Sequence, residues 1–172
     1  VSRYYAEAKA FFSLPTEIKS KYEVKGLAGQ RGYTSFGKEH AKQSNVGDLK
    51  EFFQLGQVVP EGHPLKTEYP DNITVAEVPA FTRTGVELYK AFEASGGELL
   101  HAIAVYLGLD EGYFDEKIHE GNSILRAIHY PPITSEPKTA IRAEQHEDIN
   151  LITLLVGASA GGLQILDLKN QW

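Results

Sequence analysis

Hydrophobic residues recur at helical spacing through the first part of the chain. The clearest case lies between Pro79 and Gly108, where apolar side chains return at close to helical spacing and predict one long helix with a buried face. Residues 4–12 and 15–22 predict two shorter helices, and another short helix is expected to begin at Asp110. The apolar positions of the long helix are Phe81, Leu88, Phe92, Leu99, Ile103 and Leu107.

The pattern changes to strand-like runs after Ser123. Residues 124–130 are predicted as a strand that ends at Pro131, and the apolar runs 149–156 and 162–166 predict two more strands. Helices followed by strands, without βαβ alternation, are typical of an α+β protein. We therefore expect a mainly β core, in which helices brace one face of an antiparallel sheet or jelly roll.

The earlier part of the chain adds one strand and two loops. Residues 50–56 alternate loosely and predict a strand. Residues 26–37 and 58–77 are predicted as loops, because glycine or proline interrupts them. We expect a single domain, in which residues 1–120 form the helical part and residues 121–172 the strand-rich part.

The composition describes an ordinary soluble globular protein. Of 172 residues, 42% are hydrophobic and 23% charged, which is enough for one domain with a core. The net charge of −6 argues against a nucleic-acid partner, because a polyanion requires a concentrated basic face. The apolar runs are shorter than the ~18 residues that span a bilayer, so we expect no membrane partner and a cytoplasmic location. Cysteine is missing, which excludes disulfides, zinc–thiolate sites and a cysteine nucleophile.

Both ends of the chain predict that it is part of a longer protein. It begins at Val1, without an initiator methionine and inside a predicted helix. Near Trp172, the turn at Lys169-Asn170 is expected to lead into a partner strand that lies outside the 172 residues. A hairpin without its partner would leave an exposed sheet edge, which natural proteins avoid.

His146-Glu147-Asp148 carries the strongest candidate chemistry. On a strand, residues i and i+2 face the same side, so the imidazole of His146 and the carboxylate of Asp148 would point together. These are two of the three ligands of the 2-His-1-carboxylate triad, which holds non-haem Fe(II) and leaves positions open for substrate and oxygen. Taken by itself, the His-x-Asp pattern is also compatible with a solvated turn.

A second candidate lies on the strand predicted over 124–130. By alternation, Arg126, Ile128 and Tyr130 share one face, and His129 points the other way. An arginine and a tyrosine inside a barrel require an anion or a hydrogen-bond partner, and a dicarboxylate co-substrate or an acidic substrate would serve. The alternatives are that this face is exposed to solvent, or that Arg126 pairs with a structural glutamate.

A third candidate is the phrase Gln30-Arg31-Gly32-Tyr33 in a predicted loop. Loops that combine polar and aromatic residues often line pockets, so Arg31 and Tyr33 are candidate substrate-binding residues. The alternative is a surface turn with one packed aromatic side chain.

Six phrases in a fixed order resemble one known family, the isopenicillin N synthase-like Fe(II)/2-oxoglutarate-dependent oxygenases. The resemblance covers nearly the whole chain. The phrases are Phe11-Phe12-Ser13-Leu14-Pro15, Gln30-Arg31-Gly32-Tyr33, Asp48-Leu49-Lys50-Glu51-Phe52-Phe53, Leu125-Arg126-Ala127-Ile128-His129-Tyr130-Pro131-Pro132, His146-Glu147-Asp148 with Leu151-Ile152-Thr153-Leu154-Leu155, and Gly161-Gly162-Leu163-Gln164.

The resemblance implies a double-stranded β-helix, or jelly roll, braced by N-terminal helices, with residues 121–172 as its first part. It also implies that His146 and Asp148 are iron ligands and that the Tyr130 hydroxyl helps to hold 2-oxoglutarate. The family's asparagine two positions before this tyrosine is replaced here by Ile128. The third ligand, a histidine, is expected beyond Trp172, as is the main anchor for 2-oxoglutarate.

The activity that the resemblance implies is a dioxygenase reaction. Fe(II), 2-oxoglutarate and dioxygen would oxidise a small-molecule substrate, by hydroxylation or a related step, with release of succinate and CO2. Two alternatives stay open: an iron-dependent oxidase that does not use 2-oxoglutarate, for which the substituted Ile128 leaves room, and a non-catalytic jelly-roll binding protein. Oligomeric state and substrate are not predicted.

Overall fold

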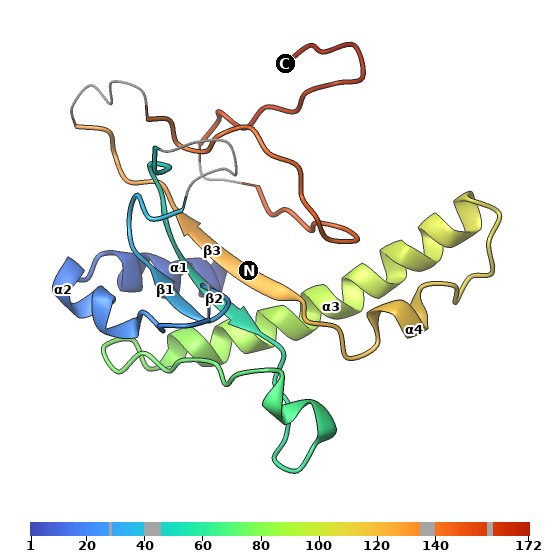
Figure 1. Ribbon diagram of the computed structural model, residues 1–172, viewed down its shortest axis with the longest axis horizontal. Helices are drawn as coiled ribbons and strands as arrows, with labels where there is room; N and C mark the ends of the chain where they lie inside the picture. Colours follow the sequence, from blue (N-terminus) through green and yellow to red (C-terminus); the bar gives the residue numbers. More distant parts are fainter. Residues whose placement is uncertain (28, 40–45, 135–139, 158–159) are drawn as a thin grey trace.

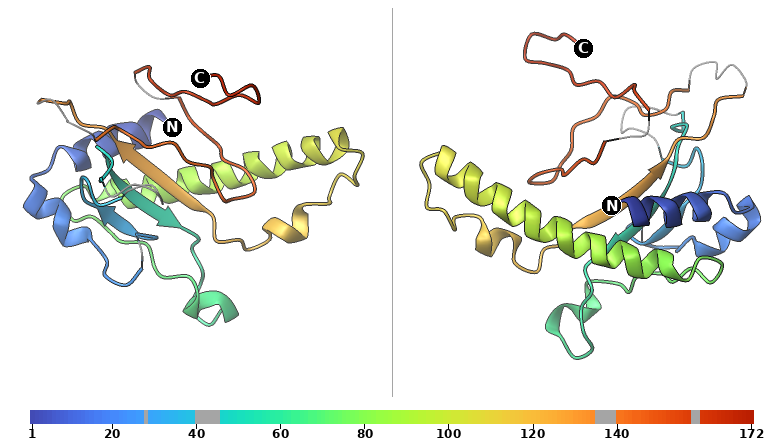
Figure 2. Two further views of the ribbon diagram at one scale, coloured as in Figure 1. Left: turned by 45° about the horizontal axis from the view of Figure 1, so that its top comes forward. Right: turned by 180° about the vertical axis from the view of Figure 1, so that it is seen from behind.

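The computed structural model describes residues 1–27, 29–39, 46–134, 140–157 and 160–172 as helices, a small sheet and connecting segments (Figure 1). Helices α1 and α3 cover one face of a three-stranded antiparallel sheet with strand order β1-β2-β3 (Figure 2). In chain order the elements are α1 (Ser2–Phe12), α2 (Thr16–Lys19), η1 (Ser20–Tyr22), β1 (Gly32–Thr34), β2 (Glu51–Gly56), η2 (Pro64–Thr67), α3 (Ala80–Tyr106), α4 (Asp115–Ile118) and β3 (Ile124–His129).

The register of β2 and β3 decides which side chains meet the helices. Glu51 is opposite His129 and Gln54 is opposite Arg126. Because side chains alternate along a strand, the odd-numbered positions of both strands face the helices and the even-numbered positions face away. The burial of β3 follows this alternation, since Leu125 is buried whereas Arg126 and Ile128 are exposed.

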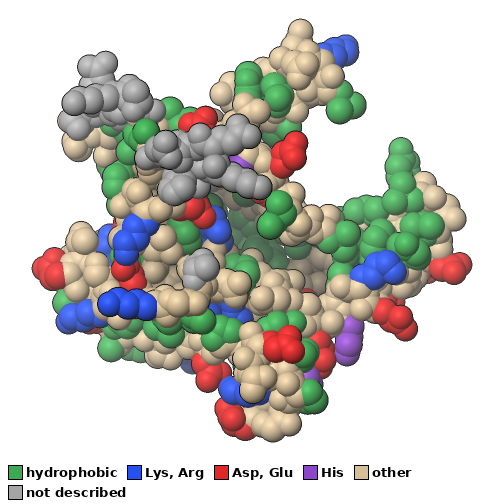
Figure 3. Space-filling model, in the orientation of Figure 1, with side chains coloured by type: hydrophobic (Ala, Val, Ile, Leu, Met, Phe, Trp, Pro, Cys, Tyr) green, Lys and Arg blue, Asp and Glu red, His purple; other side chains and the backbone are tan. Residues whose placement is uncertain are grey.

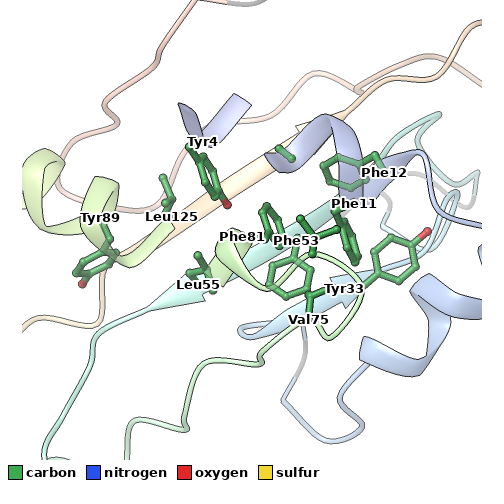
Figure 4. Packing of buried hydrophobic residues seen from close by; sticks show 12 residues of the cluster. Tyr4, Phe11, Phe12, Tyr33, Phe53, Leu55, Val75, Phe81, Tyr89 and Leu125 are labelled. Atoms are coloured by element: carbon green, nitrogen blue, oxygen red, sulfur yellow. The ribbon is translucent and has the colours of Figure 1, made fainter. Parts of the chain in front are cut away.

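Three phenylalanine rings form the centre of the core (Figure 4). Phe11 comes from α1, Phe53 from β2 and Phe81 from α3, and all three are 0% exposed. The ring centroids of Phe11 and Phe53 lie 5.1 Å apart, and those of Phe53 and Phe81 lie 4.9 Å apart. Offset and edge-to-face pairs at this spacing are the favoured geometry of aromatic rings. The two long helices and the central strand are therefore held together at one point.

Most of the predicted helices are confirmed. The long helix spans Ala80–Tyr106 and the first helix spans Ser2–Phe12. The helix predicted to begin at Asp110 begins instead at Asp115, because residues 111–114 form turns first. The prediction that 26–37 is entirely loop is wrong for Gly32–Thr34, which pairs with β2 and gains its hydrogen bonds there.

The strands predicted at 149–156 and 162–166 are not seen. The described residues of both runs form neither helix nor strand, and apolar side chains such as Ile149 and Leu163 are exposed. An isolated extended segment has no partner for its backbone hydrogen bonds, so apolar and β-branched residues alone do not make it a strand. The run does reach α3, where a Cβ atom added at Gly96 would lie 3.4 Å from Leu154 Cδ1. Among the described residues, no helix has the length and apolar character needed to cross a membrane.

The aromatic core yields a stability prediction. Replacing Phe53 with alanine removes the ring that contacts both α1 and α3, and is expected to lower the free energy of unfolding by about 4 kcal/mol. Phe36→Ala is the matched control, because Phe36 is 48% exposed and should lose less than about 1 kcal/mol. Denaturant titration of both variants measures the two losses, and equal losses would contradict the central place of Phe53.

Candidate functional site

His146 and Asp148 lie close together in the extended segment that follows the sheet. His146 Nε2 is 3.7 Å from Asp148 Oδ1, and the two side chains are about half exposed, at 56% and 51%. His146 Nδ1 lies 2.7 Å from the carbonyl oxygen of Glu144, and the Thr153 hydroxyl donates a hydrogen bond to Asp148 Oδ2. The predicted convergence of imidazole and carboxylate is thus present, although the segment is not a strand.

These two side chains suit a divalent iron ion in kind, and supply two ligands. A hydrogen bond from one ring nitrogen to a backbone carbonyl is the usual way to orient a metal-binding histidine, and it leaves Nε2 as the free ligand atom. The separation of 3.7 Å is less than twice a metal–ligand distance of about 2.1 Å, so both atoms can reach one ion. Over the described ranges, no group of three or more His, Asp or Glu side chains is placed to hold a metal.

The segment leading to His146 is fastened to the start of β2. The backbone N–H of Glu144 donates to Asp48 Oδ1 at 3.2 Å, and the N–H of Leu49 donates to the carbonyl of Ile141 at 2.8 Å. Asp48 is itself held by an ion pair with Lys50, 2.8 Å away, in which both side chains are buried. The position of the histidine therefore depends on residues that precede the strand by only one to three positions.

Arg126, Ile128 and Tyr130 lie on the face of the sheet turned away from the helices, as the alternation predicts. Ile128 is 42% and Tyr130 38% exposed. Arg126 Nε donates to Gln54 Oε1 at 2.6 Å, and its Nη1 lies 3.1 Å from Glu39 Oε1. Pairing of Arg126 with a glutamate was one of the open alternatives, and in the structure Glu39 provides it. A role for Arg126 and Tyr130 toward a co-substrate stays a prediction.

The positions of Arg31 and Tyr33 do not support the substrate-binding role predicted for them. Arg31 is completely buried, and its Nη1 donates to the carbonyl of Gln30 at 2.8 Å. Burial lowers the pKa of its guanidinium. Tyr33 is 3% exposed, and its hydroxyl donates to the Glu51 carboxylate. The reason for the difference is β1, which turns both side chains into the interior.

Glu51 is the centre of a buried polar cluster that the sequence patterns did not reveal. Lys19 Nζ lies 2.7 Å from Glu51 Oε2 and donates also to the carbonyl of Phe12, and His129 Nδ1 lies 2.8 Å from Glu51 Oε1. Burial alone would raise the pKa of Glu51, but the hydrogen bonds from Lys19, Tyr33 and His129 outweigh it and hold that pKa below its usual value. Because the Lys19 and Glu51 groups satisfy one another, the cluster fastens α2 to the sheet.

A cavity of about 440 Å³ borders this cluster on the outside. Its wall includes Lys19, Tyr33 and Glu51 from the cluster and Pro131 from the end of β3. The charged groups of this wall are already paired with each other, so they leave little capacity to bind a ligand. The sequence signal that could have found the cluster is Glu51 itself, a charged residue at a position of β2 that shares a face with Phe53.

Comparison with known proteins places the chain among oxygenases. Residues 1–77 match the sequence model of a family described as the N-terminal part of non-haem dioxygenases in morphine synthesis. The 2-oxoglutarate-Fe(II) type oxidoreductase hxnY of Emericella nidulans is 29% identical over 177 residues, which cover 96% of this chain and 50% of that protein. The proline hydroxylase buaE of Petromyces alliaceus is 33% identical, with 95% of this chain and 52% of that protein covered.

Solved structures agree with these relatives. A 2OG-Fe(II) oxygenase family protein from Caulobacter crescentus superposes with a TM-score of 0.86 and 44% identity, over 99% of this chain and 55% of that one. The chain belongs to the isopenicillin N synthase-like 2OG-Fe(II) oxygenase family. A more distant member of this oxygenase class, a full-length Neurospora crassa protein in complex with alpha-KG, has a TM-score of 0.58 and 29% identity, over 76% of this chain and 36% of that one.

Within this oxygenase family, the chain spans about half the length of the curated relatives it matches, as the coverage of 50% and 52% shows. The structure, a small antiparallel sheet with helices on one face, is consistent with part of such a protein. The family resemblance found in the sequence is thereby confirmed.

The buried cluster yields a second prediction. Glu51→Gln leaves the buried Lys19 ammonium without its counter-charge, and should lower the free energy of unfolding by about 3 kcal/mol. Glu87→Gln is the control, because the pair of Glu87 with Arg3 is exposed, at 58% and 62%, and is expected to contribute less than about 1 kcal/mol. Denaturant titrations near neutral pH compare the two variants.

The same cluster predicts a pH dependence. Since the folded-state pKa of Glu51 is lowered, its stabilising effect is complete above the ordinary carboxyl pKa of about 4.3 and is lost as the pH falls through the folded-state value. The difference in stability between the wild-type protein and Glu51→Gln should therefore shrink on acidification. A difference that stayed constant between neutral pH and pH 3 would contradict the assignment.

Proposed function

We propose that the protein is an Fe(II)- and 2-oxoglutarate-dependent dioxygenase that oxidises a small-molecule substrate with dioxygen, most simply by hydroxylation, and releases succinate and CO2. The observation that carries the proposal is the convergence of His146 Nε2 and Asp148 Oδ1, at 3.7 Å, in a chain of this oxygenase family. The names of the relatives support the same reaction class, since they include 2-oxoglutarate-dependent dioxygenases and a proline hydroxylase.

In this proposal His146 and Asp148 hold the iron. The Glu144 carbonyl faces His146 Nδ1 and thereby turns Nε2 toward the metal, and the Thr153 hydroxyl fixes one carboxylate oxygen of Asp148. When bound, Fe(II) supplies the activation of dioxygen. Because the described residues supply two ligands rather than three, the ligand set includes a further group, for which the family resemblance implies a histidine.

The proposal assigns the co-substrate 2-oxoglutarate to the side of the sheet that bears Tyr130 and Arg126. A guanidinium and a phenol hydroxyl are suitable donors for a carboxylate. Binding of this co-substrate to a related fold is supported by the Neurospora crassa structure, whose complex contains alpha-KG. The proposal also includes a jelly-roll fold for the whole protein, with β2 and β3 among its strands.

An iron-dependent oxidase without 2-oxoglutarate is the second candidate. The observation that favours it is Ile128, an aliphatic residue on the same exposed face as Arg126 and Tyr130, which offers no hydrogen bond to a co-substrate. Anaerobic titration of the full-length protein with Fe(II), followed by 2-oxoglutarate, separates the two. A weak visible charge-transfer band after the addition of 2-oxoglutarate supports the dioxygenase, and iron binding without the band supports the oxidase.

The ligand assignment makes a direct prediction. His146→Ala and Asp148→Ala each remove a metal ligand, so formation of succinate from 2-oxoglutarate should fall below detection and the affinity for Fe(II) should fall with it. His119→Ala is the matched control, since the His119 side chain is 77% exposed and lies outside the candidate site. Normal turnover in either ligand variant would show that the assignment is wrong, and a wild-type protein that binds no iron would overturn both enzyme proposals.

A further inference from the structure

The exposed face of β3 combines a cation with apolar side chains. Arg126 lies between the two strands, with its guanidinium carbon 4.3 Å from the centre of the Phe52 ring. Ile128 and Tyr130 extend the same face toward the end of the strand and are partly exposed. Figure 3 shows the molecule hollowed near its centre, between the sheet and the segment that follows it. A cation beside apolar surface is the arrangement that recognises an organic acid.

In the structure, one carboxylate already occupies this cation. Glu39 contacts Arg126 Nη1 with both of its oxygens, at 3.1 and 3.3 Å, and its Oε2 lies 2.7 Å from Lys50 Nζ. Lys50 is buried, whereas Glu39 is 31% exposed. Hydrogen bonds to Asp48 and Glu39 outweigh the effect of burial and raise the pKa of Lys50, so both cations are charged near neutral pH. Two cations therefore converge on a single carboxylate.

Removal of Glu39 would affect the two cations differently. Lys50 would keep Asp48, which lies 2.8 Å away and is almost completely buried. Arg126 would keep only the uncharged Gln54 oxygen among its hydrogen-bond partners in the described part of the chain. One nitrogen of Arg126 serves both Glu39 oxygens, whereas the strongest arginine–carboxylate pairs use two nitrogens. An incoming carboxylate can thus replace Glu39 with no change in net charge and with room for a better geometry.

We propose that Arg126, with Lys50 behind it, is a carboxylate-binding site, and that Glu39 is an internal carboxylate which occupies the site until a ligand displaces it. The ligand is an organic acid whose apolar part lies along Ile128 and Tyr130. Its source is either the 2-oxoglutarate co-substrate or the oxidised substrate. The role in turnover rests on the proposed function, whereas the binding itself does not require iron.

Calorimetry on the full-length protein without added iron tests the site. The probes are glutarate, a dicarboxylate that lacks the metal-chelating 2-oxo group, and phenylacetate, a monocarboxylate with an apolar ring. Glu39→Gln removes the internal competitor and should tighten binding of at least one probe about tenfold, the effect of one charge-assisted hydrogen bond. Arg126→Gln should weaken the same probe by a similar factor, and the double variant should behave like Arg126→Gln.

Glu87→Gln is the matched control, because it removes one negative charge at an exposed site on α3. Tighter glutarate binding in Glu39→Gln identifies the co-substrate as the source of the carboxylate, and tighter phenylacetate binding identifies the substrate. If Glu39→Gln binds both probes no better than Glu87→Gln does, the proposal is overturned. Since the measurement needs no metal, failure of this site leaves the dioxygenase proposal standing, and a protein without iron affinity would leave this site standing.

Discussion

The contact of Phe11, Phe53 and Phe81 is the constraint on which the rest of the described structure depends. These rings join α1, β2 and α3, and each is completely buried. They require α3 to approach the sheet so closely that a Cβ atom at Gly85 would lie 2.1 Å from Leu55 Cδ1. Once the helices occupy one face of the sheet in this way, the other face is the one left to carry a site.

Lys50 and Glu51 show how sharply the two faces differ. They are neighbours in sequence, yet Glu51 pairs with Lys19 on the helix side, and Lys50 pairs with Glu39 and Asp48. The Glu51 group is closed, because its partners are themselves buried and satisfied. The Lys50 group includes the partly exposed Glu39 and reaches, through Asp48, the segment that carries His146. Polar groups of similar composition thus serve attachment on one side of the sheet and the candidate site on the other.

Local patterns predicted what depends on local spacing. The helix Ala80–Tyr106, the strand Ile124–His129 and the shared face of Arg126 and Ile128 all follow from periods of 3.6 or 2 residues. Strand Gly32–Thr34 was missed because three residues carry too short a pattern, and its existence depends on pairing with β2. The run 149–156 was wrongly predicted as a strand for the converse reason: its composition suits a sheet, but in the structure no strand pairs with its described residues.

The candidate site divides in the same way. His146 and Asp148 are two residues apart, so their convergence could be predicted, and the pairing of Arg126 with a glutamate was foreseen as one alternative. That Glu39 is this glutamate could not be known, since 87 residues separate it from Arg126. Arg31 was misjudged, because a short loop-like phrase gives no sign that its arginine will be buried.

The alternation of β2 and β3 has a consequence for how such proteins diverge. Positions 125, 127 and 129 meet the helices, so a substitution there must be matched by the aromatic core. Positions 126, 128 and 130 have no such obligation and can change with the molecule that is bound. Descendants of one ancestral oxygenase that acquired different substrates should therefore differ mainly at even-numbered positions of β3, and retain the odd-numbered ones.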